Sequence, residues 1–151
     1  MKKLLIPFLV LIISLNISSQ NGRNGPSLWE EIRANSNLSY DNTKPQIIEA
    51  LKKYDSHQYL INRLSKNGQR YLFYTVSEAL KRDLPVELSL IPFIESQFDP
   101  YAQSSTGASG IWQFIPSTAI ENGLKKNWWY DARRDIVAST EAAYNLSLIH
   151  I

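Results

Sequence analysis

The sequence predicts an all-α fold, and two observations lead to that prediction. Apolar residues recur at intervals of three and four, the spacing of one helix face, along most of the chain. No segment of strand length alternates apolar and polar residues. The chain has 151 residues, of which 44% are hydrophobic and 20% charged, so it can bury a core and one globular domain is expected.

The first 19 residues indicate a secretory signal peptide. Two lysines precede an apolar run at residues 4–15, and two serines at 18–19 offer a cleavage point. The run is shorter than the roughly 20 residues of a membrane-spanning helix. A retained N-terminal anchor is the alternative, so contact with a membrane is expected only through this segment if it stays uncleaved. Either way, we expect an exported protein of the periplasm or cell envelope.

Composition excludes several classes of protein. The chain has no cysteine, which excludes a disulfide framework, a thiolate metal site, a cysteine nucleophile and a lipid-modified N-terminal Cys. Its two histidines are His57 and His150, so we expect no metal and no cofactor. Removing Lys2 and Lys3 from the 16 Lys and Arg residues leaves 14 to balance 14 Asp and Glu, which argues against a nucleic-acid partner.

Residues 20–44 begin with a polar, turn-rich stretch and indicate a flexible lead-in, with the folded part beginning near Trp29. A helical N-terminal region is expected over residues 45–83, followed by a second helical unit over residues 84–145. Within them, helices are expected near residues 45–55, 56–66, 69–82, 85–97, 115–122 and 133–145.

The last six residues, 146–151, indicate a tail that is not native. They stop the chain within a helix, without a C-cap glycine or a basic last turn. Their string, LSLIHI, also resembles the translation of a transposase adapter used in sequencing libraries. We therefore expect that the reading frame is cut and that the unit over residues 84–145 is incomplete.

One predicted helix carries a carboxylate on its apolar face. Leu84, Leu88 and Ile91 form an apolar stripe, and the next position on that stripe is Glu95. A carboxylate in this place is a local contradiction of the kind that occurs at functional sites. Pro92 within the helix is expected to remove a hydrogen bond and to favour a kink just before Glu95.

Partial burial of Glu95 would disfavour its charged form, so the carboxyl group would keep its proton nearer to neutral pH. Such an acid can protonate a leaving group, as general-acid cleavage of a glycosidic bond requires. The alternative is that Glu95 pairs with an Arg or Lys at a helix end, and the helix alone does not decide between the two interpretations.

A loop of small residues follows, at 103–110, with glycines at 107 and 110. Glycine allows a positive φ or a close backbone approach to a ligand. The loop is not a phosphate loop, since the Walker pattern is absent after the second glycine, and the Gly-x-Ser-x-Gly spacing of a nucleophile elbow also fails.

Three stretches resemble the lytic murein transglycosylases that carry the soluble-lytic-transglycosylase (SLT) domain: Glu95-Ser96, residues 107–116 (GASGIWQFIP) and residues 128–135 (WWYDARRD). The resemblance is strong over residues 84–145 and weaker over residues 28–83. It implies a lysozyme-like α fold that cleaves the β-1,4 bond between N-acetylmuramic acid and N-acetylglucosamine, so the expected partner is the glycan strand of peptidoglycan.

The resemblance also implies a role for Glu95. In the family, a single Glu at this position protonates the glycosidic oxygen and then deprotonates the muramoyl C6 hydroxyl, which attacks the anomeric carbon and leaves a 1,6-anhydro product. The nearest other acid, Asp99, is expected to cap or close the loop rather than to serve as a second carboxylate. Two alternatives are a lysozyme-type muramidase that uses Glu95 with water, and a non-catalytic cell-wall binding module.

Ser104 and Gln113 match family positions that contact substrate, and Gly110 and Trp112 join them as expected substrate-binding residues. Hydroxyl and amide groups suit sugar hydroxyls and N-acetyl groups. The ordinary alternative for Ser104 is a hydrogen bond within its own loop.

Trp112, Trp128, Trp129 and Tyr130 have rings that can stack on sugar faces, but aromatic residues at this density belong more often to a core. We therefore expect at most one of Trp128 and Trp129 at the rim of a cleft. Residues 133–135 (RRD) indicate a solvated helix start with local ion pairs.

One departure from the family concerns a later Ala-Tyr-Asn-x-Gly motif, whose Tyr helps to position the catalytic Glu. Residues 143–145 imitate its start, but Ser147 stands where Gly should be and the segment lies too close to Trp128. We expect the true motif, and any wall-binding repeats, beyond residue 151, so the chain as written is expected to lack part of the cleft and to turn over poorly.

Overall fold

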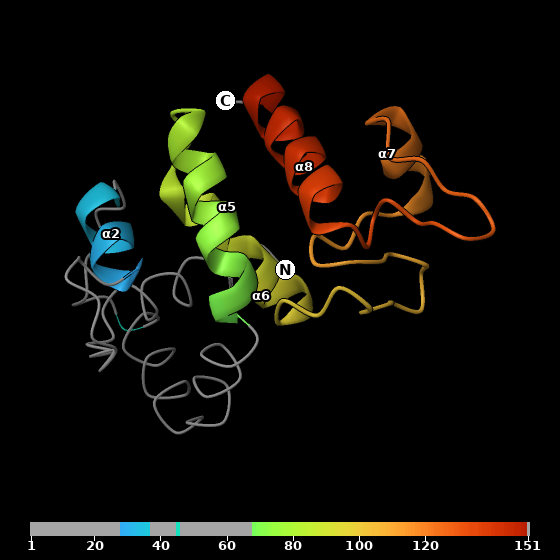
Figure 1. The fold of residues 1–151 in the computed structure, drawn as a ribbon, viewed down its shortest axis with the longest axis horizontal. Helices are drawn as coiled ribbons and strands as arrows, with labels where there is room; N and C mark the ends of the chain where they lie inside the picture. Colours follow the sequence, from blue (N-terminus) through green and yellow to red (C-terminus); the bar gives the residue numbers. More distant parts are fainter. Residues whose placement is uncertain (1–27, 37–44, 46–67, 151) are drawn as a thin grey trace.

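A computed structural model describes residues 28–36, 45 and 68–150 of the chain. In these residues all regular elements are helices, and the only strand-like pairings are isolated bridges. The predicted all-α fold is therefore confirmed for the described part. The elements are α2 (Leu28–Asn35), α5 (Gln69–Lys81), the 3₁₀ helix η2 (Val86–Leu90), α6 (Ile91–Ser96), α7 (Pro116–Glu121) and α8 (Ile136–His150) (Figure 1).

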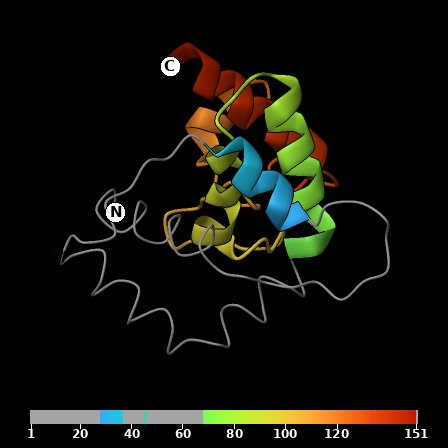
Figure 2. The same ribbon diagram turned by 90° about the vertical axis from the view of Figure 1, so that its left-hand side faces the viewer.

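Helix α5 forms the centre of the arrangement, since it packs against both η2 and α8, and α2 packs against η2. Figures 1 and 2 place α2 on the side of α5 that is turned away from α8. The largest apolar cluster joins α2, α5, η2, α6 and the loop after α6; its buried members are Trp29, Ile32, Leu72, Val76, Val86, Leu90, Phe93, Phe98 and Ile111.

Residues 28–35 form a helix, so the flexible lead-in predicted for residues 20–44 is wrong for this stretch. Trp29 and Ile32 stand three positions apart on one helix face, and both are buried in the core. This agrees with the expectation that the folded part begins near Trp29. The predicted signal peptide, the rest of the lead-in and the helices expected over residues 46–66 lie outside the described residues.

The helix predicted at residues 85–97 is divided into η2 and α6. Pro92 lies in the first turn of α6, where a missing amide removes no helical hydrogen bond, so the predicted kink inside a longer helix is wrong. The tighter 3₁₀ turn also rotates the buried face. As a result Leu88 and Ile91 are only half-buried, while Leu90 and Phe93 reach the core.

Helix α6 ends directly after Glu95 and Ser96, and its end is closed by two residues in left-handed conformation. Gln97 and Phe98 have φ values of 56° and 58°, and their amides donate to the carbonyl oxygens of Phe93 and Pro92 at 2.9 and 3.2 Å. This pattern is typical of a helix C-terminus. The chain therefore turns into the following loop within three residues of Glu95.

Helix α8 begins at Ile136, because the Asp135 carboxylate caps it. Asp135 Oδ1 accepts hydrogen bonds from the amides of Val137 and Ala138 at 2.9 and 3.0 Å. Near the other end, the buried Tyr144 hydroxyl donates to the carbonyl oxygen of Thr75 in α5 at 2.8 Å. Burial raises the pKa of Tyr144, so this donor keeps its proton.

None of the helices in the described ranges combines the length and the apolar character needed to cross a membrane.

Candidate active site

Glu95 lies in the last turn of α6 and is half-buried. No residue that the structure describes donates a hydrogen bond to its carboxyl group or forms an ion pair with it. The pairing with Arg or Lys that sequence analysis left open is therefore not observed among the described residues.

Ser96 fixes the end of α6 to the loop that follows. Its Oγ lies 2.9 Å from the carbonyl oxygen of Ile111 and 3.0 Å from that of Pro92. Ile111 is fully buried in the same apolar cluster as Phe93. The residue next to Glu95 is thus hydrogen-bonded to a loop residue that belongs to the same apolar core.

Residues 102–114, here called the site loop, fold back on themselves through backbone hydrogen bonds. The amide of Ser104 donates to Ala108, that of Ser109 to Phe114 and that of Gly110 to Ala102, at 2.9, 3.1 and 3.1 Å. Because three such bonds cross the loop, its backbone is defined without a bound ligand. The site loop is the segment against which Ser96 holds α6.

The Ser104 hydroxyl takes part in the internal bonding of the site loop. Its Oγ accepts a hydrogen bond from the Ala108 amide at 3.0 Å and lies 2.9 Å from Thr106 Oγ1. This is the ordinary local role that the sequence left open. Ser104 is half-buried, and its predicted contact with substrate stays a prediction.

The Gln113 side chain is held in one orientation by hydrogen bonds from its amide nitrogen. Its Nε2 donates to the carbonyl oxygens of Gly110 and Ala102 at 2.8 and 3.2 Å, and its backbone has a φ of 52°. The side-chain oxygen accepts no hydrogen bond from any described residue. Since the nitrogen is committed to the site loop, the oxygen is the part of Gln113 that can accept a donor from a ligand.

Gly110 meets a steric requirement that no other residue can meet. Its φ is +83°, and a Cβ at this position would lie 1.7 Å from the carbonyl oxygen of Arg133. The backbone of the site loop at Gly110 is therefore packed directly against the backbone of the segment before α8. This contact alone explains why position 110 is glycine. The predicted contact of Gly110 with substrate stays a prediction.

The solvated helix start predicted for residues 133–135 is wrong for Arg133, which is buried. Its Nη1 donates to the carbonyl oxygens of Gly107 and Phe114 at 2.8 and 3.2 Å. Its Nε and Nη2 donate to the Asp131 carboxylate, at 2.9 and 2.6 Å. Its two backbone partners lie 26 and 19 residues earlier in the chain, so no local pattern predicts that this arginine is buried.

The Asp131–Arg133 pair thus binds the backbone of the site loop at two points, through the carbonyl oxygens of Gly107 and Phe114. The hydrogen bonds from Arg133 lower the pKa of Asp131, so the carboxylate is charged at neutral pH. Arg134 is exposed, as expected, and its Nε donates to Ser109 Oγ at 3.1 Å.

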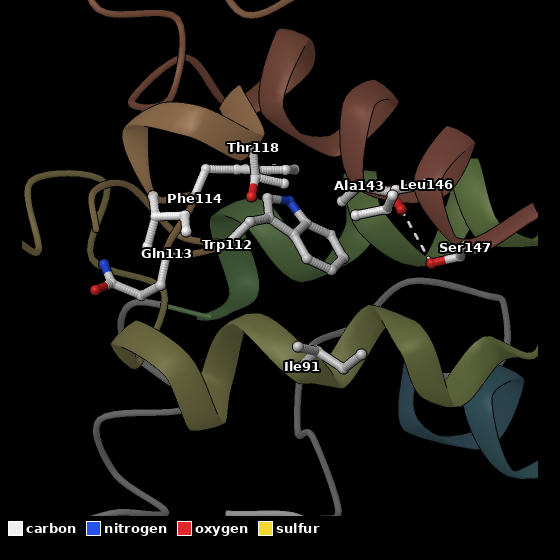
Figure 3. A pocket seen from close by; sticks show the side chains of 9 residues that line it. Ile91, Trp112, Gln113, Phe114, Thr118, Ala143, Leu146 and Ser147 are labelled. Carbon is white, nitrogen blue, oxygen red and sulfur yellow. Dashed lines mark hydrogen bonds between the residues drawn. The ribbon is translucent and has the colours of Figure 1, made fainter. Parts of the chain in front are cut away.

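Trp112 lies at the junction of three apolar clusters and lines a pocket of about 280 Å³. Its Nε1 donates to Thr140 Oγ1 at 3.0 Å, and its ring meets Tyr144 edge to face at 5.3 Å between centroids. Figure 3 shows its indole between α8 and Ile91 of α6. The pocket is lined by Ile91, Trp112, Gln113, Phe114, Ile115, Thr118, Ala143, Leu146 and Ser147.

The pocket brings Trp112 and Gln113 together, but Glu95, Ser104 and Gly110 do not line it. Ile91, which lines it, precedes Glu95 by about one helical turn. Leu146 and Ser147, near the end of α8, complete its lining. Of the predicted site residues, the structure therefore joins two directly in one cavity.

Trp128 and Trp129 are 89% and 90% exposed, so the expectation that these aromatic residues belong mostly to a core is wrong for both. They occupy the tip of a tight turn, residues 127–130, here called the aromatic turn. The Asn127 amide donates to the carbonyl oxygen of Tyr130 at 2.8 Å.

No group of three or more His, Cys, Asp and Glu that could hold a metal ion occurs among the described residues. The expected absence of a metal and of a cofactor stays a prediction.

Fold and site together define an all-α domain of the lysozyme-like class, in which the half-buried carboxyl group of Glu95, without a bonding partner among the described residues, precedes a glycine-containing loop. Residues 75–147 match the transglycosylase SLT domain family. This stretch therefore carries a transglycosylase SLT domain, which confirms the family resemblance of the sequence.

Individual relatives agree with this assignment. The chain is 44% identical over 101 residues to membrane-bound lytic murein transglycosylase D of Escherichia coli (strain K12), a match that covers 67% of this chain and 22% of the relative. It is 46% identical over 81 residues to a protein of Alteromonas sp. (strain M-1) described as a tributyltin chloride resistance protein, covering 54% of this chain and 39% of the relative. The chain thus spans about a fifth to two fifths of the length of these relatives.

Proposed function

We propose that this chain carries the catalytic part of a peptidoglycan lytic transglycosylase that cleaves the MurNAc-β-1,4-GlcNAc bond, with Glu95 as general acid and then base. One observation carries the proposal. Among the carboxylates of residues 75–147, Glu95 alone is neither exposed nor bonded to another described residue. Each of the others is exposed, caps a turn or helix, or has a bonding partner: Glu78, Asp83, Glu87, Asp99, Glu121, Asp131, Asp135 and Glu141.

The chemistry needs one carboxyl group only. Protonated Glu95 gives its proton to the glycosidic oxygen while the bond from that oxygen to the muramoyl C1 breaks. The resulting carboxylate takes the proton from the C6 hydroxyl of the same sugar, and the C6 oxygen bonds to C1. No water is consumed, the acid form of Glu95 is restored, and the product carries a 1,6-anhydro ring.

The neighbouring residues support binding in this proposal. The free side-chain oxygen of Gln113 suits an N-acetyl N–H, and the half-buried Ser104 hydroxyl suits a sugar hydroxyl. Gly110 would let the backbone approach the sugar closely, and Trp112 would offer an apolar ring face to it. We further propose that the enzyme acts in the periplasm, where the predicted signal segment would deliver it to its substrate.

The experiment is product analysis of purified sacculi digested with the full reading frame that contains this chain. Mass spectrometry is expected to show 1,6-anhydromuropeptides, and Glu95→Gln is expected to lower their rate of formation by about 10²–10⁴-fold. Glu121→Gln, which removes an exposed carboxylate from α7, serves as the matched control with unchanged turnover.

Other outcomes would identify the alternatives. Reducing-end products would make the protein a muramidase with water as the nucleophile. Unchanged turnover by Glu95→Gln would remove Glu95 from catalysis. Binding of sacculi without any turnover by the unmodified protein would leave a cell-wall binding module.

A further inference from the structure

The aromatic turn exposes two indole rings to solvent. No other described part of the molecule covers these rings. Trp128 and Trp129 are 89% and 90% exposed, and Tyr130 beside them is 43% exposed. The connection between α7 and α8, which contains this turn, extends outward at the right-hand edge of Figure 1. Exposed large aromatic rings in a cluster mark an interaction surface.

The backbone of the turn is held in place before any partner arrives. The Asn127 side-chain oxygen accepts hydrogen bonds from the amides of Trp129 and Tyr130 at 2.9 and 2.8 Å. The Tyr130 hydroxyl donates to Asp135 Oδ2 at 3.0 Å. A rigid turn loses little conformational entropy when its aromatic side chains bind, so the rings are available as a preformed contact.

The turn is also joined to the site loop. Lys126 and Asp131 form an isolated bridge that closes the turn at its base. Asp131 holds the guanidinium of Arg133, which in turn donates to the carbonyl oxygens of Gly107 and Phe114. The aromatic turn and the site loop therefore belong to one connected body, and a chain bound to the turn is held at a defined place relative to the loop.

Two lysines precede the rings in the chain. Lys125 and Lys126 are exposed, and Lys126 approaches Asp131 at 3.9 Å, a separation that leaves its ammonium group largely in water. The stem peptides of peptidoglycan carry carboxylates, and its sugars present C–H faces that suit the electron-rich face of an indole. The surface thus offers both an apolar and a cationic contact to one polymer.

We propose that the aromatic turn is a second binding element for the glycan strand, with Trp128 and Trp129 stacking on sugar rings and Lys125 and Lys126 facing stem carboxylates. The inference rests on the proposed function for the identity of the polymer. A lipid bilayer is the competing partner for exposed Trp and Lys residues, and the experiment below separates the two.

The experiment measures binding of the full reading frame, with Glu95→Gln throughout to prevent turnover, to purified sacculi by co-sedimentation. The double variant Trp128→Ala/Trp129→Ala is expected to bind about tenfold more weakly. Trp128→Phe/Trp129→Phe keeps aromatic faces and is expected to stay within about threefold of the parent. Phe73→Ala, which removes an exposed ring from α5, is the matched control with unchanged binding.

The outcomes decide the proposal in either direction. Unchanged binding of sacculi by the double alanine variant would overturn it. The proposal would also fail if Trp128 and Trp129 were needed for binding to phosphatidylglycerol vesicles but not for binding to sacculi. If ring-dependent binding is found but the protein with Glu95 intact forms no anhydro product, the binding element stands and the proposed catalytic function fails.

Discussion

The carbonyl oxygen of Arg133 occupies the position that a β-carbon on Gly110 would need, since the two would be 1.7 Å apart. Residues 23 positions apart in the sequence are therefore in backbone contact, and the site loop is seated directly against the segment before α8. The first prediction tests this contact.

Gly110→Ala is expected to destabilise the protein by about 3 kcal/mol or more, because it adds a backbone collision to the strain of a positive φ. Gly123→Ala is the matched control: its φ is +74°, but nothing lies within 4 Å of a Cβ there. The control is expected to cost only about 1–2 kcal/mol. Denaturant unfolding measures both, and equal losses would mean that the close approach to Arg133 does not exist in solution.

The second prediction concerns the pH dependence of the Asp131–Arg133 pair. The pKa of Asp131 is lowered in the folded protein, chiefly by hydrogen bonds from Arg133, so its stabilising effect is present above the unfolded pKa. That effect is lost as pH falls through the lower folded pKa. The difference in unfolding free energy between the wild type and Asp131→Asn should therefore be largest near pH 7 and shrink below about pH 4.

Denaturant unfolding across this pH range measures the difference. Glu121→Gln, at an exposed position, is expected to change stability by less than about 0.5 kcal/mol at pH 7. A difference for Asp131→Asn that stayed constant from pH 7 to pH 3 would contradict the charged pair.

A third prediction addresses Ser96 as a positioning residue. Ser96→Ala removes the link from α6 to the Ile111 carbonyl oxygen and is expected to cost about 1 kcal/mol of stability. Because Glu95 is then held less tightly beside the site loop, kcat should fall about tenfold or more with little change in KM. Ser117→Ala, at an exposed position in α7, should leave both constants as they are. A change confined to KM would argue against this role.

The fourth prediction concerns the hydrogen bond between Trp112 and Thr140, which links the site loop to α8. Thr140→Val keeps the shape of the side chain but leaves the partly buried indole N–H without its acceptor, at an expected cost of about 1 kcal/mol. In a double-mutant cycle with Trp112→Phe, the coupling energy should be about 1 kcal/mol. Strict additivity of the two losses would show that the bond contributes nothing.

Much of the candidate site could be predicted from local sequence. Glu95 stood out because a carboxylate followed an apolar stripe, and the glycines of the site loop marked an unusual backbone. The exact stripe was wrong, since η2 turns more tightly than an α-helix and buries Leu90 and Phe93 instead of Leu88 and Ile91. The prediction of a half-buried acid at the end of this segment nevertheless agrees with the structure.

The sequence by itself thus determined the all-α class, the SLT family and the candidate acid, because helix periodicity and motif spacing are properties of neighbouring residues. Only the tertiary structure decided that Arg133 is buried, that Gly110 must lack a side chain and that Trp128 and Trp129 are exposed. Burial and close approach depend on which distant segments meet. Arg133 becomes a buried clamp only because the folded chain brings the carbonyl oxygens of Gly107 and Phe114 within reach of its guanidinium.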